Sequence, residues 1–266
     1  MIKSRGPIFV HSDVGRGILA AKRAGAEIKG GHLQDSLMAF LAQHADTREA
    51  GLLFPAFNYD YGKTRVFDVD NDLVQVGALP EWVRRNREFQ RSEIPFFSFL
   101  SKGNLHLDTN GIINPFGRKS GFQWLVDHDA TLMLFGAHFS TLTFIHYVEE
   151  VSGKPVYRYD KNFPGEIVRK GQSRPCDLVM HVRPRGAHMD YDWPRLEQDL
   201  LEASLIHLPE YTADIKWLSA RKILEFWGNK LADDPFYLVD GKTRTYFEAA
   251  TDGGRTRIKI EDYEDG

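Results

Sequence analysis

Short apolar runs alternate with segments of helical periodicity along the first part of the chain. Three uninterrupted apolar runs, at residues 7–10, 51–57 and 131–136, predict buried strands. A polar or proline-containing segment ends each run. An alternating stretch around Tyr157 and Tyr159 and a run at 177–182 predict further strands.

Helical patterns lie between these runs. Apolar residues recur at helical spacing and predict an amphipathic helix over 34–45. A second helix is predicted over 79–90, where an early proline and an acidic residue favour helix initiation. After a short loop at 137–142, residues 143–150 predict a third helix.

Strands that alternate with helices predict an α/β protein with a central sheet covered by helices on both faces. Ligands in such folds bind beyond the strand ends, so the loops after residues 10, 57 and 136 are the expected binding loops. Residues 1–266 contain no internal repeat and no evident domain boundary, which predicts a single domain. The polar tail 252–266 is expected to be loosely ordered.

The net charge of −3 excludes a general electrostatic attraction to nucleic acid, for which a basic excess is typical. The densest basic cluster is Arg84, Arg85, Arg87 and Arg91, which is either a solvated helix face or an anchor for a phosphorylated ligand. A single cysteine, the lack of a signal-peptide core and the lack of a membrane-length apolar run favour a cytoplasmic protein without membrane contact.

The third predicted helix carries the clearest constellation for chemistry. On a helix, His146 shares a face with Thr143, Glu149 and Glu150. A histidine oriented by a carboxylate has a fixed tautomer and can act as a general base. The plainer interpretation is a solvated histidine in an ordinary helical ion pair. A zinc site needs further convergent ligands, and His146 has no histidine four residues away, so no metal is expected.

Two polar loops are candidate ligand sites. The loop after the first strand offers His11, Ser12, Asp13 and Val14, whose hydroxyl and backbone amides can hold a carbonyl or phosphate oxygen. The segment 114–120 combines a turn signal with Arg118, Lys119 and Ser120, and its cations suit phosphates. Either segment is also consistent with an ordinary solvated turn.

Six short motifs occur in an order that resembles the aminoglycoside 3-N-acetyltransferase family. The resemblance runs from about residue 8 to about residue 160. The motifs are His11-Ser12, Pro55-Ala56-Phe57-Asn58-Tyr59, Phe67-Asp68 with Gly77-Ala78-Leu79-Pro80-Glu81, Arg91-Ser92-Glu93-Ile94-Pro95-Phe96-Phe97-Ser98, Pro115-Phe116-Gly117-Arg118-Lys119-Ser120 and Thr143-Phe144-Ile145-His146-Tyr147-Val148-Glu149.

This resemblance implies an αβα sandwich with a mixed sheet and direct transfer of an acetyl group from acetyl-CoA to a substrate amine. It implies His146 as general base, assisted by Glu149 and Thr143. The two polar loops are then expected to bind the co-substrate. The residues expected to contact the acceptor are Phe57, Tyr59, Asp60, Glu81 and Phe97.

Departures from the family pattern concern the acceptor. Asp72-Leu73-Val74 stands where antibiotic-modifying members carry Thr-Pro-Ser, and Ile94-Pro95-Phe96-Phe97-Ser98 stands where they carry His-Pro-x-His-Ser. We therefore expect a nucleotide-linked amino sugar as the acceptor, with Phe96 or Phe97 stacking on the base, and an aminoglycoside antibiotic as the alternative. The enzyme is expected to act in surface-polysaccharide synthesis and to form a homodimer.

Two other classes of protein are also consistent with these residues. One is a non-catalytic carbohydrate- or nucleotide-binding protein on the same scaffold. The other is a metal-dependent hydrolase that uses His11, Asp13 and His146.

Overall fold

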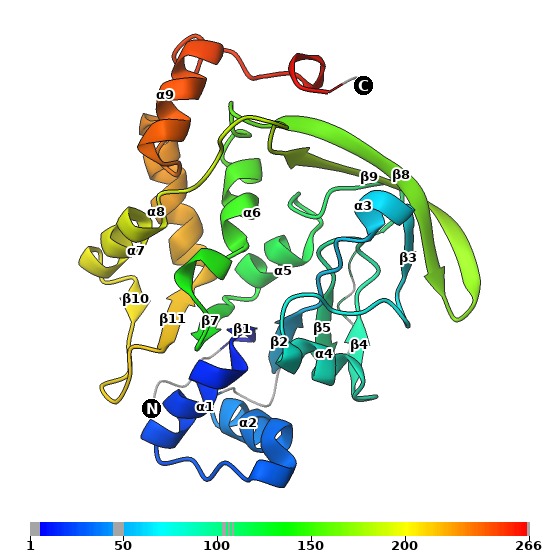
Figure 1. Cartoon of the computed structure of the whole chain (residues 1–266), viewed down its shortest axis with the longest axis vertical. Coiled ribbons are helices and arrows are strands. Elements are labelled where there is room, and N and C mark those ends of the chain that lie inside the picture. The colour runs from blue at the N-terminus through cyan, green and yellow to red at the C-terminus, as the bar shows by residue number, and fades with distance from the viewer. Residues whose placement is uncertain (1–5, 45–50, 103–104, 106, 108, 265–266) are drawn as a thin grey trace.

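A sheet of seven strands forms the centre of the molecule (Figure 1). The computed structural model describes residues 6–44, 51–102, 105, 107 and 109–264. The strand order is β10-β11-β7-β1-β2-β5-β4. The bounds are β1 Ile8–Ser12, β2 Leu52–Pro55, β4 Phe89–Arg91, β5 Phe99–Lys102, β7 Thr131–Phe135, β10 Ile206–His207 and β11 Ile215–Ser219.

The three predicted strands lie side by side at the middle of this sheet. β1 pairs in parallel with β2 on one side and with β7 on the other, with Phe9 opposite both Leu53 and Leu132. The remaining neighbours, β5, β4, β11 and β10, are antiparallel, so the sheet is mixed. Central strands are buried on both faces, which is why they appear in the sequence as continuous apolar runs.

Successive side chains of β1 point into two separate hydrophobic cores, because a strand exposes alternate residues on opposite faces. Ile8 and Val10 pack in the core beneath α1, α2 and α4, whereas Phe9 packs in the core beneath α5, α6 and α8. Helices therefore cover both faces, and the predicted α/β sandwich is confirmed. The helix bounds are α1 Val14–Arg23, α2 Leu33–Ala42, α3 Tyr61–Thr64, α4 Ala78–Arg84, α5 Gly121–Asp127, α6 Phe144–Val151, α7 Trp193–Glu202, α8 Ala220–Asp233 and α9 Gly241–Ala250, with short 3₁₀ turns η1 Gly30–His32, η2 Phe139–Thr141 and η3 Ile260–Asp262.

A second sheet of four strands lies against the first, and the expectation of one sheet missed it. Its order is β3-β8-β9-β6, with bounds β3 Val66–Asp68, β6 Ile112–Ile113, β8 Tyr159–Arg169 and β9 Gln172–Val182. The antiparallel β8–β9 hairpin pairs over eleven positions and curves past α3 and β3 at the edge of the molecule in Figure 1. Only its inner end was predicted, because the outer residues are polar and lack an apolar run.

Local hydrogen bonds explain where the helices differ from their predicted extents. The polar loop after β1 becomes helical at Val14 because the Asp13 carboxylate caps α1, accepting from the Arg16 amide at 2.9 Å. α4 ends at Arg84 rather than at residue 90, since an Asn86 turn then leads the chain into β4. α2 covers most of the predicted 34–45 helix, whose last residue lies outside the described residues.

The C-terminal segment, which was expected to be loosely ordered over 252–266, contacts the base of the hairpin. Arg257 forms an ion pair with Asp160 at 2.8 Å, and the Ile258 amide donates to the Val156 carbonyl at 3.0 Å. Glu264 accepts hydrogen bonds from Tyr159 and Lys161. These contacts hold the chain as far as residue 264, and the last two residues are outside the described part.

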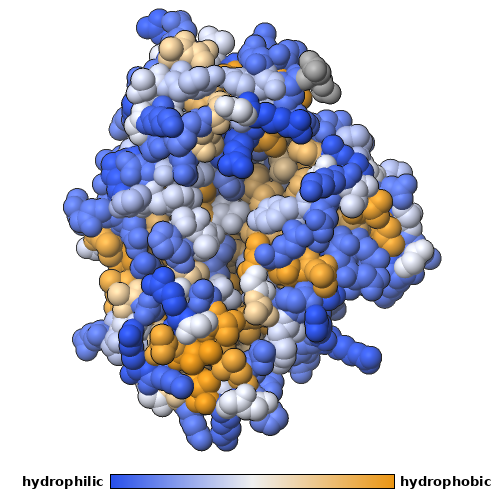
Figure 2. Space-filling model, viewed as in Figure 1, coloured by the Kyte–Doolittle hydropathy of each residue, from blue (hydrophilic) through white to orange (hydrophobic). Residues whose placement is uncertain are grey.

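Polar and charged side chains cover most of the face shown in Figure 2, while apolar ones show in its recessed middle and over the end that carries α1 and α2. None of the described helices has the length and apolar composition that a membrane span requires.

Gly136 ends β7 and sets the direction of the loop that leads to α6. Its φ is +71°, and a β-carbon there would lie 2.4 Å from the Gly17 amide nitrogen. Gly171, at the tip of the β8–β9 hairpin, has a similar φ of +73° but open space around the equivalent position.

Gly136→Ala should therefore lower the free energy of unfolding more than Gly171→Ala. The left-handed conformation costs both variants about 1–2 kcal/mol. Overpacking against backbone atoms costs Gly136→Ala roughly 1–3 kcal/mol in addition. Urea denaturation measures the free energy of unfolding of both variants. Equal losses would show that the atoms around Gly136 move aside for a methyl group without an energetic penalty.

Candidate active site

His146 lies in the first turn of α6 and forms part of the walls of two cavities. Its side chain is 25% exposed. The cavities have volumes of about 430 and 380 Å³ and meet at this imidazole. A group at this position can contact two different ligands at once.

The first cavity, called the hydroxyl cavity below, has no charged side chain in its wall apart from the titratable histidines. It opens beyond the ends of β1, β2 and β7, where the fold class predicts ligands. Its lining residues are His11, Ser12, Phe57, Tyr59, Val76, Ala137, Ser140, Thr141, Leu142, Thr143, Ile145, His146 and Trp193. Burial lowers the pKa of His11 to about 4, so its ring is neutral at pH 7.

Two polar atoms in the wall of the hydroxyl cavity have no hydrogen-bond partner within the described part of the chain. They are His11 Nε2 and Ser12 Oγ, both buried. Because buried polar atoms are normally paired, a ligand that reached these two atoms would satisfy them.

The second cavity, called the aromatic cavity below, lies on the other side of His146, between α6 and the base of the hairpin. Its lining residues are Phe97, Phe116, His146, Arg158, Met180, His181, Val182, Arg183, Met189, Asp190 and Tyr191. The 114–120 segment contributes its phenylalanine. Asn114 Nδ2 donates to the Glu150 carboxylate at 2.9 Å, which fixes Phe116 against the His146 ring at 5.2 Å between centroids.

Beneath His146, the Glu149 carboxylate is 1% exposed and surrounded by donors. Tyr157 donates to Oε1 at 2.8 Å and Tyr191 donates to Oε2 at 2.7 Å. Arg158 Nε lies 3.2 Å from Oε2. Burial alone would raise the pKa of Glu149. The charge of Arg158 and the hydrogen bonds from His146 and His181 outweigh it and hold that pKa well below its usual range.

The same contacts define the tautomer of His146. Its Nδ1 lies 2.9 Å from the Tyr191 hydroxyl oxygen and 3.3 Å from Glu149 Oε2. Because the Tyr191 proton is donated to Glu149, Nδ1 must carry the proton in this chain of contacts, and Nε2 keeps its lone pair. Burial lowers the pKa of His146 to about 4, with Arg158 and His181 adding to the effect and Glu149 opposing it. The ring is thus a neutral proton acceptor at pH 7.

His181, on β9, is the second histidine of this network. Its Nδ1 lies 2.9 Å from Glu150 Oε2 and its Nε2 lies 3.4 Å from Glu149 Oε2. His146, Glu149 and His181 place three possible metal-ligand atoms within 4.8 Å of one another. The Arg158 cation already neutralises the shared carboxylate, so the arrangement does not favour a divalent ion. His11 and Asp13, the other predicted metal ligands, are not part of this cluster.

The structure brings about half of the predicted site residues together. His11, Ser12, Phe57, Tyr59, Thr143 and His146 line the hydroxyl cavity, Phe97 lines the aromatic cavity, and Glu149 lies directly behind His146.

The other residues predicted to bind the co-substrate line neither cavity. The Asp13 amide donates to the Phe135 carbonyl, and its carboxylate caps α1, while Val14 packs against the core under α1. Ser120 is a buried cap of α5, accepting from the Gln123 amide at 3.2 Å. Arg118 and Lys119 are exposed in the adjoining turn, and none of these residues lines either cavity.

Asp60 and Glu81, predicted to contact the acceptor, also lie outside both cavity walls. Asp60 accepts from the Gln75 side chain at 2.9 Å. Glu81 forms ion pairs with Arg84 and Arg85 at 2.8 and 3.1 Å. These pairs support the plainer interpretation of the arginine cluster, whose members there neutralise an acid of their own helix.

Sequence reasoning missed Arg158, His181 and Tyr191, which complete the surroundings of His146. Arg158 directly precedes the hairpin, His181 lies on its second strand and Tyr191 lies in the segment after it, all beyond the last recognised motif, which ends at Glu149. A histidine within the apolar run 177–182 was the one available signal, since buried histidines need partners.

An α/β fold with a carboxylate-bound histidine between two cavities is an arrangement that an acyltransferase can use. A family model described as aminoglycoside 3-N-acetyltransferase matches residues 42–232, which is more than half of the chain. The chain belongs to the aminoglycoside 3-N-acetyltransferase family. It is a CoA-dependent N-acetyltransferase with acetyl-CoA as its co-substrate, as the motif order implied.

Solved structures share the fold over most of their length. A mutant of aminoglycoside acetyltransferase AAC(3)-IVa in complex with a gentamicin is 18% identical, with a TM-score of 0.67 and 97% of this chain and 92% of that chain covered. The AAC-IIIb binary complex with CoASH is 17% identical, with a TM-score of 0.66 and coverages of 87% and 91%.

The YokD protein from Bacillus subtilis is 14% identical, with a TM-score of 0.65 and coverages of 86% and 88%. At these identities the likeness establishes the fold alone. Among curated proteins, no relative matches this chain.

Tyr191→Phe should lower kcat roughly tenfold, which corresponds to about 1.4 kcal/mol, the scale of a hydrogen bond to a charged group. The variant removes the hydroxyl that joins His146 Nδ1 to Glu149. Tyr157→Phe is the matched control, because it removes a hydrogen bond to the same carboxylate without touching His146. Steady-state kinetics with acetyl-CoA compares the two. An equal loss in both variants would assign Tyr191 a role in holding Glu149 only.

Proposed function

We propose that this protein transfers the acetyl group of acetyl-CoA directly to an amine of an amino sugar, with His146 as the general base. The observation that carries the proposal is the position of His146 in the walls of both cavities. Direct transfer needs both substrates beside one proton acceptor, and this imidazole is neutral and has a fixed tautomer.

The hydroxyl cavity suits the arm of acetyl-CoA that carries the thioester. The arm contains amides and a thioester but no charge, and the cavity wall has four residues with an aliphatic hydroxyl, Ser12, Ser140, Thr141 and Thr143. The unpaired His11 Nε2 and Ser12 Oγ supply polar contacts for its amides. The Thr143 hydroxyl, which donates a 3.3 Å hydrogen bond to the Thr141 carbonyl, would donate instead to the thioester oxygen as that oxygen gains charge.

The amine attacks the thioester carbon from the aromatic cavity. A nitrogen–carbon bond forms, His146 Nε2 accepts a proton from the nitrogen, and the carbon–sulfur bond breaks. The proton then passes from His146 to the sulfur, which leaves as the free thiol of CoA. The buried Glu149 carboxylate, reached through Tyr191, stabilises the transient imidazolium. No enzyme nucleophile is needed, and buried Cys176 lies outside both cavity walls.

Two acceptor classes are candidates. The structural relatives support an aminoglycoside, since AAC(3)-IVa is in complex with a gentamicin and AAC-VIa is bound to sisomicin. The nucleotide-linked amino sugar expected from the sequence, with its place in polysaccharide synthesis, has no counterpart among them. Of the two rings expected to stack on its base, Phe97 lines the aromatic cavity, whereas Phe96 is buried between Tyr61 and Phe163. The predicted homodimer and cytoplasmic location stay predictions.

His146→Asn should cut turnover at least a hundredfold, because a positioned base contributes about 10²- to 10⁴-fold. Thiol release from acetyl-CoA is measured against a panel of aminoglycosides and nucleotide-linked amino sugars, with CoA affinity of the variant measured separately. The affinity should stay within a few-fold of wild type. Wild-type turnover in the variant would remove His146 from the mechanism, and the panel ranks the two acceptor classes.

Between pH 5 and pH 7, log kcat/KM should rise with pH with a slope of one. This range lies below the pKa of the acceptor amine, and the amine is the only reacting group that gains a proton as the pH falls. A histidine with an ordinary pKa near 6.5 would steepen the slope to two in this range. The pKa of His146, lowered to about 4, keeps it unprotonated there. A slope of two above pH 5 would contradict the lowered pKa.

A further inference from the structure

We infer that the acceptor is an amino sugar that carries an anionic group, a phosphate or a carboxylate, and few amines besides the reacting one. This rests on the proposed function, in which the aromatic cavity receives the acceptor. The inference comes from the charges that line this cavity and from how each of them is paired.

Two of the charged or titratable groups in the wall are already satisfied within the protein. Arg158 lies 3.2 Å from the Glu149 carboxylate, and its Nη2 donates to the Tyr191 hydroxyl at 2.7 Å. His181 Nδ1 lies 2.9 Å from Glu150. Because Arg158 is paired with Glu149 and His181 with Glu150, neither group offers an unpaired charge to a ligand.

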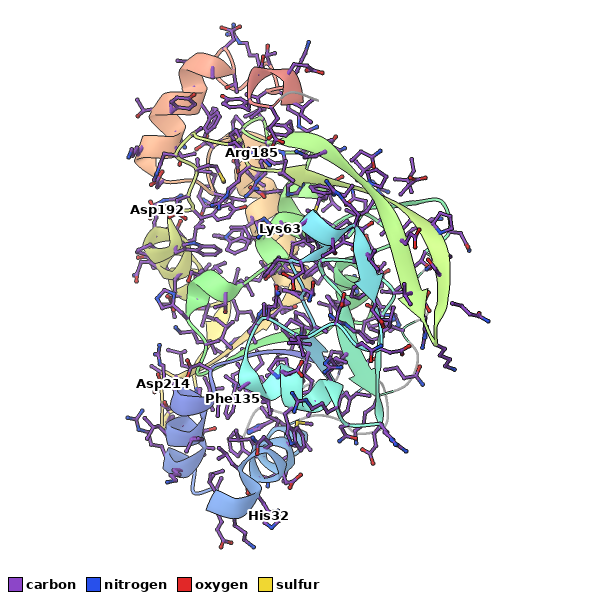
Figure 3. The ribbon with its side chains drawn as sticks, turned by 45° about the vertical axis from the view of Figure 1, so that its right-hand side comes forward. His32, Lys63, Phe135, Arg185, Asp192 and Asp214 are labelled. Atoms are coloured by element: carbon purple, nitrogen blue, oxygen red, sulfur yellow. The ribbon has the colours of Figure 1, made fainter. Side chains whose placement is uncertain are left out.

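Arg183 and Asp190 are the remaining residues of this wall with a full charge. Arg183 follows directly after β9, is exposed, and makes neither a hydrogen bond nor an ion pair with any described residue. Asp190 is the only carboxylate among the lining residues described, and its Oδ1 accepts from the Tyr191 amide at 2.8 Å. Arg185, two residues further on, lies on the same segment (Figure 3) but is directed to Glu264, 3.7 Å away. The cavity therefore offers a ligand one open cation and one partly used anion.

This balance does not suit a polycation. An aminoglycoside carries several ammonium groups, and each one taken from water without a carboxylate partner is unfavourable. Arg183 adds repulsion between like charges. An acceptor whose amine approaches His146 and whose anionic group reaches Arg183 fits the same walls, because a guanidinium binds phosphate or carboxylate through two hydrogen bonds.

The remaining wall is apolar and suits a ring. Phe97 and Phe116 lie 4.6 Å apart between centroids, and Met180 and Met189 complete the surface. Apolar side chains with a few placed polar groups are the usual composition of a small-molecule site. We expect the sugar ring to pack against this apolar surface, and Arg183 to select for an acceptor with an anionic group.

The test compares acceptors that differ in charge. Thiol release is measured with glucosamine, glucosamine 6-phosphate, a nucleoside-diphosphate-linked amino sugar, glucosaminic acid and gentamicin. Binding of each to the CoA-saturated enzyme is measured by calorimetry. We expect the anionic probes to bind at least tenfold more tightly than glucosamine, and gentamicin to bind most weakly. Comparison of the phosphate, nucleotide-linked and carboxylate probes shows which anionic group the cavity prefers.

Arg183→Glu should raise KM for the preferred anionic acceptor at least tenfold and change kcat less, while glucosamine, which has no anionic group, should bind at least as tightly as it does to the wild type. Arg183→Lys should recover part of the affinity. Arg185→Glu is the matched control, since it reverses a charge on the same segment outside the cavity wall.

Tighter binding of gentamicin than of every anionic probe, or an unchanged KM in Arg183→Glu, would overturn the inference. Absence of thiol release with every acceptor would instead contradict the proposed function, and the two failures are thus distinguishable.

Discussion

The buried ion pair between Glu149 and Arg158 is the interaction on which the site depends. A carboxylate removed from water is costly unless it is paired and hydrogen-bonded, and Glu149 satisfies both conditions through Arg158, Tyr157 and Tyr191. It also joins two parts of the fold, because Glu149 belongs to α6 and Arg158 to the segment that enters β8. The pair that keeps the carboxylate ionised thus also fixes the hairpin against the catalytic helix.

The pair has a second effect on His146. A carboxylate close to a histidine would by itself raise the pKa of the ring and favour the imidazolium. Arg158 offsets that influence, and burial outweighs it, so the ring stays neutral. The same charge that stabilises Glu149 therefore preserves the lone pair that His146 needs for its proposed role as a base. The Tyr191 hydroxyl bridges His146 Nδ1 and the Glu149 carboxylate and so orients the ring, while Nδ1 and Oε2 stay 3.3 Å apart.

The central sheet and the catalytic helix could be predicted from the sequence, whereas half of the site could not. β1, β2 and β7 are continuous apolar runs, and His146 with Glu149 follows from helical spacing, since both signals are local. The aromatic cavity depends on pairing between β8 and β9 and on its contact with α6, which no local pattern encodes. The role of Arg118 and Lys119 stays a prediction, because they lie in an exposed turn outside both cavity walls and a basic turn does not reveal which ligand it faces.

The two cavities are built from different parts of the fold. The hydroxyl cavity lies at the ends of central strands, whose packing involves both hydrophobic cores. The aromatic cavity takes most of its wall from the end of β9 and the segment that follows it, which lie outside the central sheet. If the hydroxyl cavity holds acetyl-CoA and the aromatic cavity holds the amine, as proposed, sequence change in the aromatic wall alters which amine is accepted without disturbing the strands beside acetyl-CoA. The architecture then separates the acetyl-transfer chemistry from an adaptable acceptor specificity.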